Sequence, residues 1–453
     1  MTTATLLPRA DAPSAARSRL AFAGIAAGNL LVLLDTSILN VALPDLQRTL
    51  HPAAAAVPWA VDAYTVLFAG LLLAAGALAD RWGPRRVYRA SLAAFAVLSA
   101  LCAAAPGIDS LILGRALLGA AGAGLVPASL GLLIAMNPDP ARRTWAVGAW
   151  TAVSGLGAAA GPVLGGFLVE LGGWRLVFLV APPIALAALA LARRLPVPPR
   201  AAARPLDRPG MLLSTGALGA LTFGLVEAGV AGWTAPQTLA PLALAVLAFA
   251  ALVVVERRVA SPVLPPSLLA LPRVRAALVA AAVACFSFYG CLYLLDLWLQ
   301  HAYRLSPLDA GLASLPLTLP VCVMPFFTGR LVARRGARPV LLAGMTASVL
   351  AGLLLLAATG HHPPLALLIV AELALAGTGT LSIPGASAEM AVAAPTELAA
   401  TGQGALNGIR QAGSALGVAV LGTTGTLSAA GAVVLLVGVA AVFTVERATR
   451  RRA

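Results

Sequence analysis

The sequence predicts an all-α integral membrane protein with fourteen transmembrane helices, and three observations support this fold class. Hydrophobic residues make up 60% of the chain and charged residues 11%, which excludes a soluble globular or a disordered protein. Apolar stretches of about 20 residues recur along the chain, and that length crosses a bilayer core of about 30 Å. The positive charge gathers in the loops on one side of these stretches.

That positive charge is all arginine, because the sequence contains no lysine. When the chain is threaded through fourteen spans, Arg48, Arg175 and Arg304 reach one side, and Arg115 and Arg410 lie within helices. All other arginines fall on the opposite side. Positive loops remain in the cytoplasm, so we expect both termini to be cytoplasmic in the cell inner (plasma) membrane. The net charge of +14 is then better explained by attraction of the arginines to anionic lipids of the cytoplasmic leaflet than by binding of nucleic acid.

The expected spans form two six-helix bundles, 20–194 and 275–446, with a two-helix hairpin inserted in the linker 195–274. Short tails at 1–19 and 447–453 flank them. The last two spans are separated only by the polar run 423–426, but together they are long enough for two crossings at 1.5 Å per residue. The spans are 20–43, 57–79, 87–105, 110–135, 145–169, 175–194, 210–228, 238–256, 275–299, 308–332, 338–358, 364–385, 402–422 and 427–446.

A repeat supports the division into two related bundles. The segment 76–85 follows the second helix of the first bundle, and 329–338 follows the second helix of the second. Glycine, arginine, glycine and arginine recur in register between them, whereas Ala333 stands where the first copy has Asp80. Two related bundles in one chain are typical of rocking transporters that bind their substrate near the bilayer midplane.

Several motifs in this order resemble the major facilitator superfamily, specifically its fourteen-spanner drug:proton antiporter branch. The repeat segment is similar to the superfamily's loop signature, and helices 1, 2, 4 and 5 carry segments similar to those of the branch. One departure is Ala181-Pro182-Pro183, where the family commonly has asparagine before proline. The motif segments are Leu34–Pro44, Trp59 with Tyr64, Gly76–Arg86, Gly114–Gly119, Gly157–Gly166, and Trp174-Arg175 with Phe178.

The resemblance implies a proton-coupled antiporter that exports small hydrophobic drugs or antibiotics by alternating access, and the acids within the spans favour cationic ones. Its partners would be protons, a small-molecule substrate and the lipid bilayer, with no nucleic acid, no cofactor and a monomeric state. No histidine or cysteine cluster has the spacing of a metal site. A phosphate-binding loop with its lysine is absent from the sequence, so an ATP-driven pump is disfavoured.

Asp35 is the leading proton-carrier candidate, because a carboxylate inside an apolar span is costly and should face a polar cavity. Burial disfavours its charged form, so it could load and release a proton. Arg115 lies at a similar depth in the fourth span and is its expected partner. A permanent structural ion pair is the alternative interpretation for both residues.

The gating candidates lie in the loop signature and in helix 5. The resemblance implies that Asp80 and its arginines form a latch at the cytoplasmic side, while topology alone would explain the arginines. The glycines of helix 5 recur every four residues, so they present a bare face for close helix packing, and a proline bends a helix. We expect this face to seal one bundle against the other. The gating residues are Gly76, Asp80, Arg81, Gly83, Arg85, Arg86, Gly157, Gly161, Pro162, Gly165 and Gly166.

The substrate-binding candidates are polar residues within the spans. Acidic groups around an apolar cavity would suit lipophilic cations, although Arg410 could equally receive an anionic group. Glu227 near a helix end is a weaker candidate. The candidates are Asp62, Tyr64, Asp296, Glu372, Asn407, Arg410 and Gln411.

Three alternatives remain open at this stage. A narrow exporter of one metabolite or self-made antibiotic would have the same fold and motifs. A membrane-embedded enzyme is disfavoured, because the sequence shows no zinc motif and no nucleophile elbow. A non-transporting receptor would move no protons in response to substrate.

Overall fold

The computed structural model describes residues 15–52, 56–57, 59–192, 207–259, 262, 264–305, 312–360 and 362–450. Over these residues the chain is helical, without strands, and helices occupy each of the expected span ranges. The N-terminal 14 residues, the tail 451–453 and the linker segment 193–206 lie outside the described residues.

The first seven helices form one bundle, and the last two of them together make up the sixth expected span. We expected one helix over 175–194, and Trp174–Ala192 forms one apolar span of 19 residues, with a turn at Val180 just before Pro182 and Pro183 that divides it into two helical segments. Proline lacks the backbone N–H that would continue the ladder, so the turn follows from the sequence. The helices are α1 (Ala15–Leu50), α2 (Trp59–Trp82), α3 (Pro84–Ala103), α4 (Ile108–Met136), α5 (Pro140–Gly172), α6 (Trp174–Leu179) and α7 (Ala181–Ala192).

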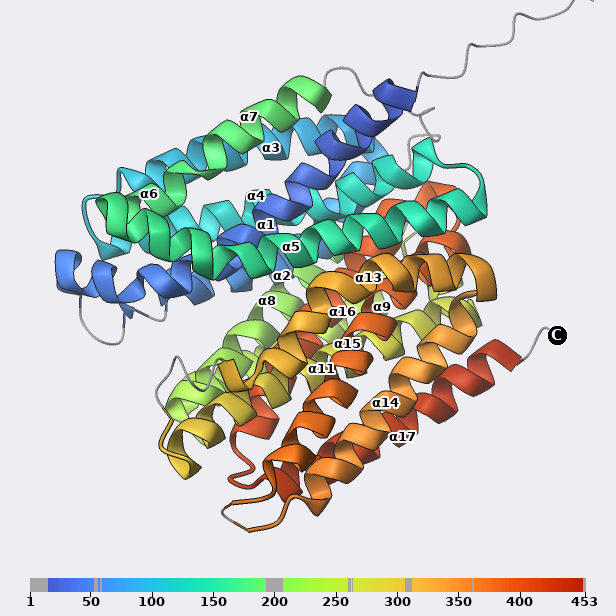
Figure 1. Ribbon diagram of the computed structural model, residues 1–453. Helices are drawn as coiled ribbons and strands as arrows, with labels where there is room; N and C mark the ends of the chain where they lie inside the picture. Colours follow the sequence, from blue (N-terminus) through green and yellow to red (C-terminus); the bar gives the residue numbers. More distant parts are fainter. Residues whose placement is uncertain are drawn as a thin grey trace, which may run out of the picture.

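Two helices between the bundles pack against each other: α8 (Arg208–Ala231) and α9 (Pro236–Glu256). The first of them also contacts α2 of the first bundle and α16 of the second. The green-to-yellow pair therefore lies beside the boundary between the blue-green and orange-red bundles (Figure 1). A short helix, α10 (Pro266–Ala270), follows in the linker.

The remaining helices form the second bundle. One of them, α13, bends by 56° between Leu315–Pro325 and Phe327–Arg335, and Pro320 and Pro325 in its interior account for a sharp bend. The helices are α11 (Pro272–Ala302), α13 (Leu315–Arg335), α14 (Ala337–Ala357), α15 (Leu365–Ala393), α16 (Ala399–Gly422) and α17 (Leu427–Arg450), with a 3₁₀ turn at Thr396–Leu398.

Eleven of the described helical segments are long and apolar enough to cross a membrane, or twelve if the bent α13 counts as one span. Two expected spans, α5 and α16, do not meet this criterion. In α16 the reason is polarity: Thr401, Gln403 and Asn407 are buried against other helices. A helix whose polar groups face protein needs less apolar surface than one that faces lipid.

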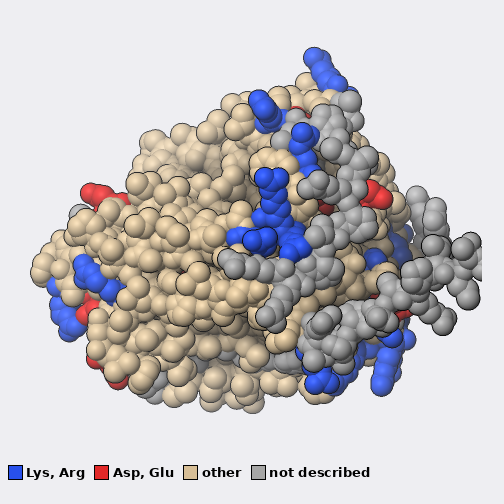
Figure 2. Space-filling model, turned by 90° about the horizontal axis from the view of Figure 1, so that it is seen from above, with Lys and Arg blue, Asp and Glu red and all other residues tan. Residues whose placement is uncertain are grey.

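The outer surface of the molecule suits an apolar medium. Val163 is 78% exposed, Leu212 74% and Leu436 70%, whereas a soluble protein limits such contiguous apolar exposure. Figure 2 shows a broad tan band without charged side chains, between charged groups at the left edge and arginines on the right half.

The two bundles meet along two seams, α2 with α16 and α5 with α13. A Cβ atom added to Gly76 would lie 2.6 Å from the carbonyl oxygen of Ala400, and one added to Gly148 would lie 2.5 Å from Cα of Gly329. The helices can approach so closely at both points only because glycine has no side chain. Both points lie near the α2–α3, α4–α5 and α13–α14 connections, which we call the arginine-rich end.

Candidate functional site

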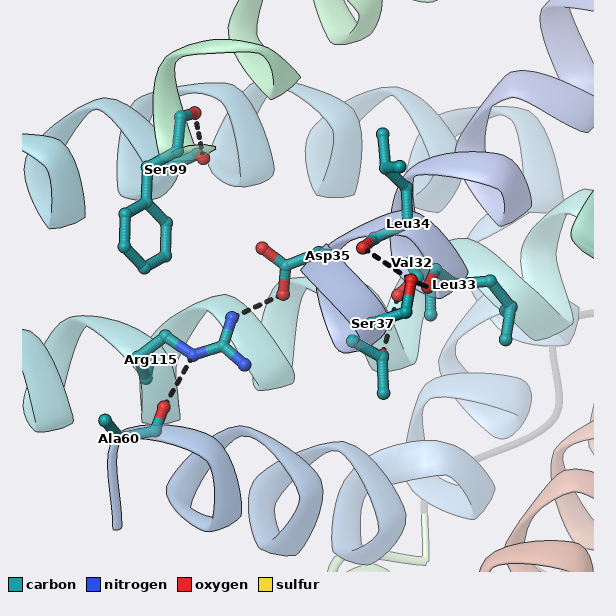
Figure 3. A network of polar contacts seen from close by, with 10 residues as sticks. Val32, Leu33, Leu34, Asp35, Ser37, Ala60, Ser99 and Arg115 are labelled. Carbon is teal, nitrogen blue, oxygen red and sulfur yellow. Dashed lines mark hydrogen bonds and ion pairs between the residues drawn. The ribbon is translucent and has the colours of Figure 1, made fainter. Parts of the chain in front are cut away.

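An ion pair lies between α1 and α4, where the Arg115 guanidinium donates from Nη1 to Oδ2 of Asp35. Both side chains are buried: Asp35 is 6% exposed and Arg115 is fully enclosed. Figure 3 shows the two side chains pointing toward each other from their helices. The expected partners are therefore brought together, and the proton-carrying role of the pair stays a prediction.

Further contacts fix the position of Arg115. Its Nε donates to the carbonyl oxygen of Ala60 in the first turn of α2, at 2.8 Å (Figure 3). Its guanidinium carbon lies 4.5 Å from the centre of the Tyr64 ring and 5.9 Å from that of Phe178, distances suited to cation–π attraction. Arg115 thus links α4 to α1, α2 and α6.

Close helix packing places these groups side by side. A Cβ atom on Gly119 would collide with the carbonyl oxygen of Tyr64, so α2 and α4 can cross here only because position 119 lacks a side chain. Tyr64 itself is 1% exposed. The geometry around Arg115 therefore depends on glycine in the Gly114–Gly119 segment, as well as on the charged residues.

The two opposite charges of this pair stabilise each other strongly. Removing one member of a buried ion pair typically costs about 3–5 kcal/mol, because the other charge stays buried without compensation. Protonation of Asp35 would likewise weaken its attraction to Arg115. Loss of the charge on Asp35 would therefore weaken the packing of α1 against α4.

The glycine face of α5 lies against α1 of the same bundle. A Cβ atom on Gly157 would lie 2.7 Å from the carbonyl oxygen of Leu30, one on Gly165 would lie 2.9 Å from that of Ile38, and one on Gly161 would collide with Ser37. We expected this face to close against the other bundle, and the structure corrects that expectation. The reason is register: Gly148, which faces α13, lies about two and a half turns before Gly157 and therefore on the opposite side of α5.

Two other members of this motif contribute less to the packing. A Cβ atom on Gly166 would meet only Val41 Cγ1, at 3.9 Å. Pro162 falls within α5, but its side chain lies outside the described residues. The close contacts of α5 with α1 therefore come from Gly157, Gly161 and Gly165, which meet α1 between Leu30 and Ile38.

The loop acid Asp80 joins the two bundles at the arginine-rich end. Its Oδ1 accepts from the backbone N–H of Ala400 at 3.0 Å, and its Oδ2 from that of Thr401 at 2.7 Å. These N–H groups begin α16, whose own N-cap residue, Leu398, supplies no side-chain cap. A carboxylate is favourable at this positive end of a helix. Asp80 therefore caps a helix of the opposite bundle.

The other gating candidates of the first loop shape the turn around Asp80. Gly83 has φ 89°, a backbone conformation that favours glycine, and it separates α2 from α3. Arg86 on the first turn of α3 is exposed, while Arg81 and Arg85 are partly buried. Gly83 thus lets the chain reverse directly after the turn of α2 that carries Asp80.

A further contact between the bundles was not anticipated from the sequence. Arg143 at the start of α5 donates from Nη1 to the carbonyl oxygen of Ala391 near the end of α15, at 3.0 Å. The same guanidinium also binds the carbonyl oxygens of Asn137 and Pro138. Every residue has a carbonyl oxygen, so the sequence cannot show which residue accepts this hydrogen bond. It could indicate only the arginine.

The substrate-binding candidates lie in separate places. Asp62 is half-buried on α2 and close enough to Glu227 of α8 for the two carboxylates to repel each other. Nearby, the rings of Trp59 and Phe223 lie 4.9 Å apart. Helix α8 therefore brings an acid of its own to the start of α2.

The second bundle contains a different polar group on α16. Arg410 donates from Nη1 to Oδ1 of Asn407 at 3.0 Å, and Asn407 donates to the carbonyl oxygen of Gln403 at 2.9 Å. Gln411 is half-buried next to them. Among the described residues, Arg410 forms no ion pair with an acid.

Two acidic candidates stand apart from these groups. Glu372 on α15 is 2% exposed, and its Oε2 has no hydrogen-bond partner among the described residues. Position 296 falls in α11, but the side chain of Asp296 lies outside the described residues. The described part of the chain contains no cluster of three or more histidine, cysteine or acidic side chains that could hold a metal ion.

Comparisons with known proteins agree with this arrangement. Residues 25–418 match the family model of the Major Facilitator Superfamily. The chain is 34% identical to the methylenomycin A resistance protein of Streptomyces coelicolor, over 91% of this chain and 86% of that protein. It is 37% identical to the puromycin resistance protein of Streptomyces alboniger, over 89% and 80%. The structure of the human organic anion transporter aligns with a TM-score of 0.69 and 18% identity, over 94% of this chain and 99% of that one.

Proposed function

The chain belongs to the Major Facilitator Superfamily, and from that premise we propose that it is a proton-coupled antiporter. It would export small hydrophobic drugs or antibiotics by alternating access. Membership of this family makes the chain a membrane transporter of small molecules rather than an enzyme. Relatives named for resistance to methylenomycin A and puromycin support export as the direction of transport.

The buried pair of Asp35 and Arg115 is the observation on which proton coupling rests. A fully enclosed guanidinium and a carboxylate that is 6% exposed are expensive in an apolar bundle, and such groups mark proton or ion pathways in membrane proteins. When the carboxylate takes up a proton, the guanidinium loses its counter-charge. The packing of the helices that hold the two groups is then less stable, which favours a change in their arrangement.

The topology that we propose has fourteen spans, with α8 and α9 as the inserted pair between two six-helix bundles and the chain acting as a monomer. The arginine-rich end would face the cytoplasm, together with both termini. The polar helix α16 and the glycine-rich α5 would count as spans, because each packs against several helices of both bundles.

The contacts at the arginine-rich end support an outward-facing state. Asp80 binds the start of α16, and Arg143 binds the end of α15, so both fasten the bundles together at the proposed cytoplasmic side. Breaking these contacts would let the bundles rock apart there and open the inner side. Asp80 is in this account a latch released once per transport cycle.

The polar groups along the helices support substrates that combine an apolar body with a charge. Asp62, Glu227 and Glu372 would favour lipophilic cations, and Tyr64 offers an aromatic ring beside the ion pair. A narrow exporter of one antibiotic is the second candidate, because the two relatives compared above are each named for a single compound.

The test of coupling is proton-gradient-driven uptake into inverted membrane vesicles, with puromycin and methylenomycin A followed by a panel of cationic, neutral and anionic compounds. We expect uptake by the unaltered chain and none by Asp35→Asn, because asparagine cannot release a proton. Asp109→Asn serves as the matched control, since Asp109 is exposed in the first turn of α4.

A second variant separates coupling from folding. Asp35→Asn leaves Arg115 buried without a counter-charge, so it could unfold the protein at a cost of about 3–5 kcal/mol. The double variant Asp35→Asn with Arg115→Gln removes both charges and should restore thermal stability without restoring uptake. Proton-driven uptake by the stable double variant would overturn the proposal.

A further inference from the structure

An apolar cleft lies between the first bundle and the inserted helix α8. Its volume is about 960 Å³, and its walls come from α2, α3, α4 and α8. Leu71 and Leu78 line one side, and Met211 and Leu212 line the other. Because Leu212 is 74% exposed, the cleft opens onto the outer surface of the molecule. The buried pair of Asp35 and Arg115 is not among its lining residues.

The cleft forms where α2 and α8 diverge. These helices cross closely at Gly70, where an added Cβ atom would lie 3.1 Å from the carbonyl oxygen of Thr215 and 3.3 Å from Gly219. The lining residues 71–82 and 208–215 all lie on the arginine-rich side of this crossing. Small residues such as Ala74 and Ala120 complete the lining and leave this space open.

The end of the cleft that lies away from this crossing carries positive charge. Arg86 on α3 and Arg208 at the start of α8 both line the cleft and are exposed. Within the described part of the chain, neither forms an ion pair. Trp82, 48% exposed, lies with them, and tryptophan is typical of the level of lipid headgroups. The cleft is therefore apolar along its length and cationic at one end.

We propose that this cleft binds one anionic phospholipid of the cytoplasmic leaflet, with an acyl chain between α2 and α8 and the phosphate between Arg86 and Arg208. The depth of the cleft, within the span of two membrane helices, favours an acyl chain over a water-borne ligand. The two arginines come from opposite walls, so a phosphate between them would hold α8 to the first bundle.

The proposal gives the inserted helices a role. α8 contacts both α2 and α16, which belong to different bundles and meet at one of the two seams. A lipid that fastens α8 to α2 and α3 would therefore stabilise the inserted pair against the bundle that carries the ion pair. This role concerns lipid binding alone and does not depend on proton coupling.

Native mass spectrometry of the purified full chain tests the proposal directly. Phosphatidylglycerol and phosphatidylcholine with identical acyl chains are the probes. We expect phosphatidylglycerol to bind more tightly, and the double variant Arg86→Gln with Arg208→Gln to lose about 25-fold in its affinity, roughly fivefold for each arginine near the membrane surface. Binding of phosphatidylcholine should change little.

The matched control is Arg334→Gln with Arg338→Gln, two exposed arginines around the corresponding loop of the second bundle. It removes the same charge at the same end of the molecule but away from the cleft, and should keep its phosphatidylglycerol affinity within twofold. An equal loss in both double variants would mean diffuse attraction and would overturn the site. Equal affinity of the unaltered chain for the two lipids would do the same.

A photoreactive residue identifies the occupant. Leu212→p-benzoylphenylalanine places the probe at the exposed lip of the cleft, and we expect illumination in membranes to attach a phospholipid to it. Attachment to residues 193–206 of the same chain, or to a second copy, would show that protein fills the cleft and would refute lipid binding. Thermal unfolding of each variant checks that the exposed substitutions leave the fold intact.

Discussion

Both seams between the bundles depend on closely packed glycines, but among the described residues only the α2–α16 seam contains an acidic residue that caps the opposite helix. Gly76 of α2 lies against the start of α16, and Gly329 of α13 lies against Gly148 of α5. The glycine recurs in both copies of the loop repeat, and each seam pairs the second helix of one bundle with the fifth of the other. Close backbone approach is thus a shared requirement of both seams.

The acids differ because the two fifth helices begin differently. α5 has its own cap, since Asp139 accepts from the backbone N–H of Arg142 at 2.8 Å. α16 has Leu398 at that position and relies on Asp80 across the seam. The second copy of the repeat therefore has no uncapped helix to bind, and Ala333 stands where Asp80 would be. Because Asp139 caps α5 locally, α13 needs no acidic residue at position 333.

The largest change should come from adding a side chain where the seams are tightest. Gly148→Leu would press on Cα of Gly329, a backbone atom that cannot rotate away. Overpacking of this kind costs about 1–3 kcal/mol, so we expect the bundles to separate at the arginine-rich end by a roughly tenfold shift in population. Spin labels on cysteines introduced at the exposed positions 142 and 338, with the four native cysteines replaced by serine, would measure it.

The control for this variant is Gly219→Ala, because a Cβ atom there meets nothing within 4 Å. Gly76→Leu should act like Gly148→Leu if the seams are equivalent. A distance distribution unchanged by either leucine would contradict the packing argument for both seams.

An intermediate change should follow from Asp80→Asn. Hydrogen bonds to a charged group contribute about 1.5–3 kcal/mol, and asparagine keeps one acceptor oxygen, so we expect a loss of about 1 kcal/mol. That loss corresponds to a roughly fivefold shift toward separated bundles in the same spin-label experiment. If Asp80→Asn left the distances unchanged while lowering thermal stability, the acid would be a helix cap and no latch.

The smallest change should follow from Asp139→Ala, which removes the local cap of α5. Loss of an N-cap side chain costs about 1 kcal/mol of helix stability, but the affected contact lies within one bundle. We therefore expect a lower unfolding temperature and a shift of less than twofold in the distance between the bundles. A shift as large as that of Asp80→Asn would erase the distinction between the two caps.

Much of the helical architecture could be predicted, because apolar length is set by the thickness of a bilayer. The predictions missed features that depend on single residues: the turn at Val180 within the sixth span, the bend of α13, and the short helix α10. The extent of α1 was also underestimated, since its helix continues to Leu50, beyond the apolar stretch that ended the prediction at residue 43.

The part of the candidate site formed by charged side chains could be predicted from the sequence. Asp35 and Arg115 are conspicuous as charges in apolar helices, and their contact follows from similar depth. The carbonyl acceptors at Ala60 and Ala391 could not be predicted, because every residue has such an oxygen. The partner of the α5 glycine face was also wrong, because helix rotation decides whether α1 or α13 meets it.

The uncapped start of α16 has a consequence for synthesis of the chain. Its first N–H groups bind the Asp80 carboxylate of α2, which leaves the ribosome about 320 residues earlier. Its buried polar residues make α16 a poor candidate for independent insertion. We therefore expect the second bundle to finish folding only against a first bundle that is already in place. Expressed as a separate fragment, residues 272–450 should be degraded unless the first bundle is supplied with them.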